Sequence, residues 1–251
     1  MSGRSPDSSA DADHRRRGVT AATPVPRRQA LADNVYEAVK GLIMDHEIEP
    51  DARISIDGLA RQLEVSPTPV REALARLESA ELVVKEPLRG YRATALLSHE
   101  QLADLYQFRL LIEPWAAAQA ARLATEDDRE QLRAEMATAH VPNETGYDAY
   151  KTLTAHDTRL HVLIAELAGS DQVRQAFERT HCHLHIFRLS YHRTIGTQTI
   201  DEHQKIVDAI TRADPDAAEQ AMRDHLATSC YERLLPLYGT QKNLTSREET
   251  R

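Results

Sequence analysis

The sequence has little of what holds secreted or membrane proteins together. Only two cysteines occur among the 251 residues, Cys182 and Cys230, so a disulfide scaffold is excluded and a reducing cytoplasm is the expected setting. No apolar run approaches the roughly 20 residues that a transmembrane helix needs. The arginines at 15–17 are not followed by the apolar segment of a signal peptide. We therefore expect a cytoplasmic protein without a membrane partner.

Aromatic residues are also scarce, at 5% of the chain, and only nine glycines occur. A chain with few aromatic residues and much Ala, Leu, Glu and Arg favours helix over sheet. The sequence contains no glycine-rich loop that could cradle a phosphate and no recognisable nucleophile motif. The expected fold class is mainly α, and sequence motifs give little support to an enzyme.

The net charge of -8 is unevenly distributed along the chain. Residues 1–96 contain 14 basic and 15 acidic side chains, a net of -1, which leaves 17 basic and 24 acidic side chains, a net of -7, for residues 97–251. An acidic C-terminal half can coexist with a DNA-binding N-terminal half if the basic groups of the latter gather on one face.

A small N-terminal domain is expected over residues 27–96, after a disordered tail at 1–26. Apolar residues recur at three- and four-residue steps from Ala30, and Ser55 and Ser66 are suited to cap two further helices. Residues 82–84 and 91–94 flank a turn and predict a two-stranded hairpin. Three short helices and a hairpin describe a winged helix-turn-helix, although other small helical domains share this outline.

The third of these helices carries the expected DNA-reading face. Its apolar stripe should be buried, which leaves polar and basic side chains to contact phosphates or base edges. The hairpin tip could reach a neighbouring groove. The candidate DNA-binding residues are Ser66, Thr68, Arg71, Arg76, Arg89 and Gly90. A surface ion pair for Arg71 and a solvated loop charge for Arg89 are the alternatives.

Residues 97–239 are expected to form an all-helical effector-binding and dimerisation domain, followed by a tail at 240–251. No segment of it shows sustained strand alternation. The periodicity predicts helices over 98–123, 126–141, 144–168, 171–192, 198–213 and 215–238. Pro114 should kink the first of them.

Three of these helices place ionisable side chains on apolar faces. Asp157 and His161 are four residues apart and point the same way, and His203 and His225 lie on the apolar faces of two later helices. A bare carboxylate in an apolar core costs several kcal/mol, which a cation would offset. One carboxylate and three imidazoles suit a divalent ion, with zinc or nickel preferred. Each histidine could instead be a hydrogen-bonded core residue, and Asp157 could pair with Arg109 or Arg159.

A second group of histidines lies nearby in the sequence. His181, His183 and His185 alternate, and His192 follows. On a helix His181 and His185 would share a face. We interpret the group as an interface or a pocket lining, with His181 as an additional candidate ligand.

Several motifs resemble known families. The segment from Val65 to Glu78, with its run Pro-Val-Arg-Glu-Ala-Leu, resembles the recognition segment of GntR-type transcription regulators, and residues 88–91 are similar to their wing. The C-terminal half is similar to the FadR-type ligand domain called FCD. Its motifs match residues 108–114, 157–161, 202–210 and 222–226, with Leu160 in place of the usual aromatic residue. The resemblance implies that Asp157, His161, His203 and His225 bind the ion, as in metal-containing FCD members.

The combined interpretation is a ligand-responsive transcription regulator. An open position on a divalent cation favours an oxygen donor, so a small carboxylate is the expected effector, with Arg109 as its partner. A homodimer would bind an inverted-repeat operator, and the resemblance implies a repressor. The alternatives are a metal-dependent enzyme that uses the same Asp and three His, and a metal-storage or scaffold protein.

Overall fold

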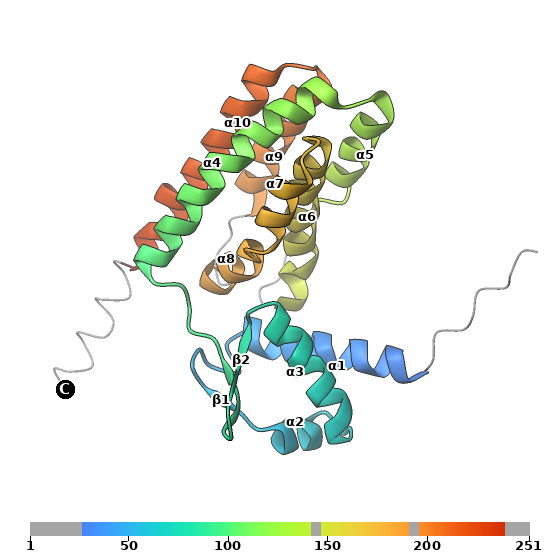
Figure 1. The fold of residues 1–251 in the computed structure, drawn as a ribbon, viewed down its shortest axis with the longest axis vertical. Helices are drawn as coiled ribbons and strands as arrows, with labels where there is room; N and C mark the ends of the chain where they lie inside the picture. The colour runs from blue at the N-terminus through green and yellow to red at the C-terminus, as the bar shows by residue number, and fades with distance from the viewer. Residues whose placement is uncertain (1–26, 142–146, 191–195, 239–251) are drawn as a thin grey trace, which may run out of the picture.

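The computed structural model describes residues 27–141, 147–190 and 196–238. Figure 1 shows a small domain with three short strands beneath a taller bundle of helices, joined by an extended segment that leads into the longest helix. The two expected tails, residues 1–26 and 240–251, and His192 lie outside the described residues.

The small domain is a winged helix-turn-helix. Its elements are, in chain order, α1 (Arg27–Met44), β1 (Arg53–Ile54), α2 (Ile56–Gln62), α3 (Pro67–Ser79), β2 (Val83–Glu86) and β3 (Gly90–Ala93). The predicted hairpin is confirmed as the antiparallel pair β2–β3. The short strand β1 was not predicted, and it pairs with β3 so that the sheet order is β1-β3-β2.

The two predicted caps behave differently. The Ser55 side chain accepts a hydrogen bond of 3.0 Å from the Gly58 amide and caps α2, as expected. Ser66 does precede α3, but its side chain makes no capping hydrogen bond, so that part of the prediction is wrong. Pro67 opens the helix with a fixed φ and no N–H to satisfy, and Ser66 is left exposed to solvent.

The C-terminal part is a helical bundle. Its helices are α4 (His99–Leu123), α5 (Glu126–Met136), α6 (Tyr147–Leu167), α7 (Asp171–Glu178), α8 (Cys182–Ser190), α9 (Gly196–Thr211) and α10 (Pro215–Ala227), followed by the π-helix η1 (Thr228–Leu234). The long helix α4 continues through Pro114 and packs against α10, α6 and α9. No helix of the described residues is both long and apolar enough to cross a lipid bilayer.

Two of the predicted helices differ from the structure in their winding, and the helix expected over 126–141 ends at Met136. The single helix expected over 171–192 is wrong, because the chain breaks between α7 and α8 at His181, whose φ of 44° lies in the left-handed region. The helix expected over 215–238 is helical throughout, but it widens into the π-helix η1 between Ala227 and Leu235, where the α-helix resumes. Apolar periodicity of 3.6 residues does not reveal either local change in winding.

Candidate metal centre

Four side chains from three helices meet inside the bundle. Asp157 and His161 extend from α6, His203 from α9 and His225 from α10. One ligand atom from each lies within 4.8 Å of the others, and all four residues are buried. The structure therefore brings together the four residues that the sequence singled out.

His161 is held from behind by a buried ion pair on α4. Its Nδ1–H donates to Oε2 of Glu113. Oε1 of Glu113 in turn accepts a 2.5 Å hydrogen bond from Nε of Arg109, and its Oε2 lies 3.3 Å from Nη2 of the same guanidinium. Burial by itself would raise the pKa of Glu113, but Arg109 and His161 outweigh it and hold that pKa well below its ordinary value. Glu113 is thus a charged acceptor that orients the His161 ring.

His225 is held in the same manner by residues of α9 and η1. Its Nδ1–H donates to Oε2 of Glu202 over 2.8 Å. The guanidinium of Arg233 grips both oxygens of Glu202, at 2.7 and 2.8 Å. Burial tends to raise the pKa of Glu202, but the hydrogen bonds from His225 and Arg233 lower it to about 2. A second arginine–glutamate pair therefore supports a second histidine of the cluster.

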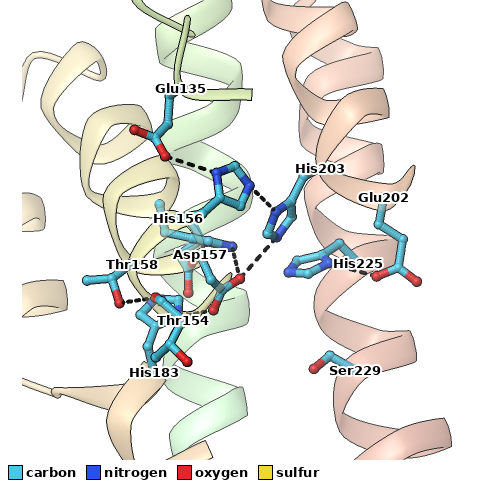
Figure 2. Close-up of polar contacts among 12 residues, drawn as sticks. Glu135, Thr154, His156, Asp157, Thr158, His183, Glu202, His203, His225 and Ser229 are labelled. Atoms are coloured by element: carbon cyan, nitrogen blue, oxygen red, sulfur yellow. Dashed lines mark hydrogen bonds and ion pairs between the residues drawn. The ribbon is translucent and has the colours of Figure 1, made fainter. Parts of the chain in front are cut away.

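His203 is supported through a further histidine. Figure 2 shows His156 between Glu135 and His203. Nδ1–H of His156 donates to Glu135 over 2.9 Å, and the remaining Nε2 of His156 lies 3.2 Å from Nδ1 of His203. Arg159 binds both oxygens of Glu135, at 2.9 and 3.0 Å. All three cluster histidines are thus linked to an arginine–glutamate pair through their Nδ1 atoms.

These contacts fix which nitrogen of each ring carries the proton. An ionised carboxylate only accepts hydrogen bonds, so Nδ1 of His161 and of His225 must be protonated. Burial lowers the pKa of His161 to about 3 and that of His225 to about 4, so both rings are neutral near pH 7. A neutral ring protonated on Nδ1 has its lone pair on Nε2. His156 donates its Nδ1–H to Glu135, so the lone pair of its neutral ring is on Nε2 and accepts from Nδ1–H of His203. The lone pair of His203 is therefore also on Nε2.

The donor set fits a divalent cation. Nε2 of His161 and Nε2 of His203 are buried and make no hydrogen bond with any described residue, although His203 Nε2 lies 3.1 Å from Oδ1 of Asp157. Two nitrogen lone pairs that converge on a buried carboxylate oxygen form an arrangement that a metal ion completes. Asp157 pairs with neither Arg109 nor Arg159, since those arginines are bound to Glu113 and Glu135.

Asp157 has a partner that sequence reasoning did not assign. Its Oδ2 accepts a hydrogen bond from Nδ1–H of His183 on α8. Burial raises the pKa of Asp157, but the charge and hydrogen bond of His183 reverse this effect and lower it well below the ordinary value. The expected additional ligand, His181, lies instead in the break between α7 and α8, and His185 lines a groove next to β2.

A cavity adjoins the cluster. Its lining includes Asp157 and His225 together with the arginines Arg109 and Arg233 and the hydroxyl group of Ser229. Arg109 was expected to bind an effector, and it does face this cavity, but its guanidinium is already bound to Glu113. Arg233 was missed because it follows the α-helical part of the last helix, where the widened turn of η1 redirects it.

The candidate DNA-binding residues lie on the winged helix-turn-helix. Ser66, Thr68 and Arg71 are exposed at the start of α3, and Arg89 and Gly90 are exposed at the tip of the hairpin. Arg71 has no ion-pair partner among the described residues, so the alternative of a surface ion pair finds no support there.

Arg76 differs from the other candidates for DNA binding. Its Nη1 lies 2.6 Å from Asp33, and its guanidinium covers the Tyr36 ring at 4.1 Å. This side chain connects α3 with α1, so a DNA contact by Arg76 would have to be shared with Asp33.

The sequence matches two family models, one for each part of the fold. Residues 31–93 match the model described as bacterial regulatory proteins of the gntR family, and residues 104–228 match the FCD domain. The chain belongs to the GntR family of transcription regulators and carries an FCD domain. The resemblance noted in the motifs is thereby confirmed, and so is the mainly helical fold with a winged helix-turn-helix.

Several relatives that match most of the chain are named as transcription regulators. The chain is 28% identical to the putative L-lactate dehydrogenase operon regulatory protein of Escherichia coli K12, over 81% of this chain and 85% of the relative. It is 29% identical to the HTH-type transcriptional repressor NanR of E. coli K12 DH10B, over 79% of this chain and 82% of the relative. These matches identify a transcription regulator, so the alternative of a metal-dependent enzyme is set aside.

Solved structures share the fold at lower identity. The E. coli protein McbR/YncC superposes with a TM-score of 0.59 at 19% identity, covering 84% of this chain and 98% of that structure. A GntR-type regulator from Rhodococcus sp. RHA1 superposes with a TM-score of 0.55 at 20% identity, again over 84% of this chain and 98% of the other. Both support the arrangement of a winged helix-turn-helix and a helical bundle.

Proposed function

We propose that this regulator is a repressor whose FCD domain holds a divalent cation, zinc or nickel, through Asp157, His161, His203 and His225. The observation that carries the proposal is the direction of the three rings. Each has its Nδ1 tied to an outer partner, and each has its Nε2 lone pair left for the cluster, where Asp157 supplies the negative charge. Neutral imidazole and carboxylate groups of this kind are the usual ligands of zinc and nickel.

The adjoining cavity is the proposed effector site, and a small organic acid is the proposed effector. A bound cation would offer an open coordination position to a carboxylate oxygen. Arg109 and Arg233 supply positive charge on the cavity wall, and Ser229 supplies a hydroxyl group. An anion that enters would compete with Glu113 and Glu202 for the two guanidiniums, which would connect effector binding with the orientation of His161 and His225.

The winged helix-turn-helix is the proposed operator-binding part. Ser66, Thr68 and Arg71 would approach one groove from α3, and Arg89 and Gly90 would reach the next from the hairpin. A homodimer would present two such heads to an inverted repeat. The repressor role is supported by the names of relatives such as NanR and GlaR, both described as transcriptional repressors.

The metal proposal is tested by elemental analysis of the purified protein, followed by titration of the chelator-stripped protein with zinc and with nickel. We expect one ion per chain in the wild type and a large loss in His203→Ala, with the circular dichroism spectrum retained. His140→Ala is the matched control, because His140 is exposed and lies outside the cluster. Full metal content in His203→Ala would place the ion elsewhere.

The regulatory proposal needs a second measurement. Native mass spectrometry of the metal-loaded protein would detect a retained small acid, and a mobility-shift assay with DNA from upstream of its own gene would detect an operator. Addition of the retained acid should release the DNA. An acid that binds without changing DNA affinity would contradict the proposed effector role.

A further inference from the structure

Helix α8 (Cys182–Ser190) lies between the metal cluster and the winged helix-turn-helix and contacts both. On one face Cys182 and Ile186 belong to the core of the bundle. On another face Leu184 and Phe187 pack against the core of the winged helix-turn-helix. A helix of nine residues thus has its two apolar faces in two different domains.

The bundle-side contacts of α8 reach the cluster itself. His183 donates from Nδ1 to the carboxylate of Asp157, one of the four proposed ligands. Ile186 and Phe187 line the cavity next to the cluster. A movement of Asp157 or of the cavity wall would therefore move residues of α8 that contact them.

The C-terminal end of α8 also makes polar contacts with the winged helix-turn-helix. Arg188 is 1% exposed, and it donates to Oγ1 of Thr94 over 2.9 Å and to the carbonyl oxygen of the same residue over 2.8 Å. Nε2–H of His46, in the turn after α1, donates over 3.0 Å to the Arg188 carbonyl oxygen. These bonds give the buried guanidinium of Arg188 no carboxylate partner, and a buried charge without its hydrogen bonds costs free energy. Loss of the bonds to Thr94 would therefore be unfavourable, which holds α8 in one position against the winged helix-turn-helix.

Thr94 extends this connection to the recognition helix. It follows β3 directly, and its Oγ1 donates to the carbonyl oxygen of Glu81 over 2.9 Å. Its amide donates to the carbonyl oxygen of Leu82, so it ties the end of the wing to the two residues after the α3 cap. A shift of Arg188 would therefore change the angle at which α3 and the hairpin are held.

We propose that α8 is the element that couples the cluster to the DNA-binding domain, with His183 and Phe187 as its input and Arg188 as its output. This inference rests on the proposed function for the metal as the input signal. The coupling itself is carried by contacts between the chain's own side chains. Coupling requires that the two arrangements of the joint differ in their affinity for the ligand.

The test is hydrogen–deuterium exchange on the full chain, with zinc as the probe. Zinc added to the stripped wild type should slow exchange in peptides from α6 and α9, and should also change exchange in peptides covering 83–97. In Arg188→Met the first effect should remain and the second should be lost. Thr94→Val is the second variant, in case Arg188→Met folds poorly; it removes the bond to Oγ1 but leaves the bond to the carbonyl oxygen, so it should reduce the second effect. Arg174→Met is the matched control on α7, where Arg174 pairs only within its own domain.

A metal-free comparison separates the two proposals. His183→Ala removes the contact with Asp157, whereas His183→Asn retains a donor near the position of Nδ1. Faster exchange over 83–97 in His183→Ala than in His183→Asn supports the coupling even if zinc does not bind, in which case only the metal proposal fails. Equal exchange in these two variants, or a zinc effect at 83–97 that survives in both Arg188→Met and Thr94→Val, would overturn the role of α8.

Discussion

Nε2 of His156 lies 3.2 Å from Nδ1 of His203, so a histidine of the cluster is oriented by a second histidine behind it. Both rings are fully buried, and the outer ring is fixed by Glu135 on α5. His156 directly precedes Asp157 in α6, so of these two neighbours one orients a ligand on α9 and the other is itself a proposed ligand.

His156→Gln should weaken metal binding without removing the site. Loss of an outer hydrogen-bond partner costs about 10- to 100-fold in metal affinity at comparable sites. We expect a rise of that size in the dissociation constant for zinc, measured by competition with a chelating dye, while saturating zinc still gives one ion per chain. His140→Gln, at an exposed position, should bind zinc as the wild type does. Equal affinity in the two variants would show that the contact between the histidines has no effect on the ligand.

Glu113→Gln should strongly destabilise the metal-free fold. Arg109 is 2% exposed, and the substitution leaves its charge buried without a counter-ion. Breaking a buried pair in this way costs about 3–5 kcal/mol. The measurement is the free energy of unfolding in urea, at neutral pH and with a chelator present.

Glu219→Gln provides the comparison for this experiment. Glu219 pairs with Arg223 at 3.0 Å, but both side chains are nearly half exposed. Removal of such a surface pair costs at most about 1 kcal/mol. A loss in Glu113→Gln as small as that in Glu219→Gln would mean that water reaches Arg109 in solution.

The sequence predicted the four cluster residues because each carries its own signal. The i, i+4 spacing of Asp157 and His161 places both on one face of α6, and His203 and His225 interrupt apolar faces. Helical periodicity shows which side of a helix is buried, and this is enough to select inward-facing polar groups.

The supporting residues could not be predicted in the same way. Glu202 binds His225 on another helix, and Glu135 acts through His156, so both roles depend on which helices are neighbours. Arg109 and Glu113 are four residues apart, a spacing that ordinary surface ion pairs share. The one available signal was the alanine-rich surroundings of Glu113, which indicate burial. Helix packing, rather than the pattern of any single helix, decides these contacts.

Arg71→Ala should weaken operator binding by about 1–3 kcal/mol if Arg71 reads a base edge. The side chain is exposed on α3 and has no ion-pair partner among the described residues, so the folded state should be little affected. The measurement is fluorescence anisotropy with a selected operator and with a scrambled duplex. A base contact predicts a loss confined to the operator, whereas a phosphate contact predicts a similar loss on both DNAs. Arg133→Ala, a loss of charge on α5, is the control, and an Arg71→Ala variant that binds as tightly as this control would remove Arg71 from the interface.

Glu135→Gln should alter the response of stability to acid. Burial raises the pKa of Glu135, but hydrogen bonds from Arg159 and His156 outweigh this effect, so its pKa in the folded chain lies below the ordinary value of 4.5. A depressed carboxyl pKa stabilises the fold above the unfolded-state pKa, and this contribution is lost as the pH falls through the folded-state pKa. The wild type should therefore exceed Glu135→Gln in free energy of unfolding at pH 7, and the difference should shrink steadily below pH 4.5. Urea titrations of the metal-free proteins over this range measure the difference.

Glu130→Gln, at an exposed position of the same helix, should differ little from the wild type in free energy of unfolding at every pH. If the difference in free energy of unfolding between the wild type and Glu135→Gln stays constant as the pH falls, then Arg159 and His156 do not stabilise the ionised carboxylate of Glu135.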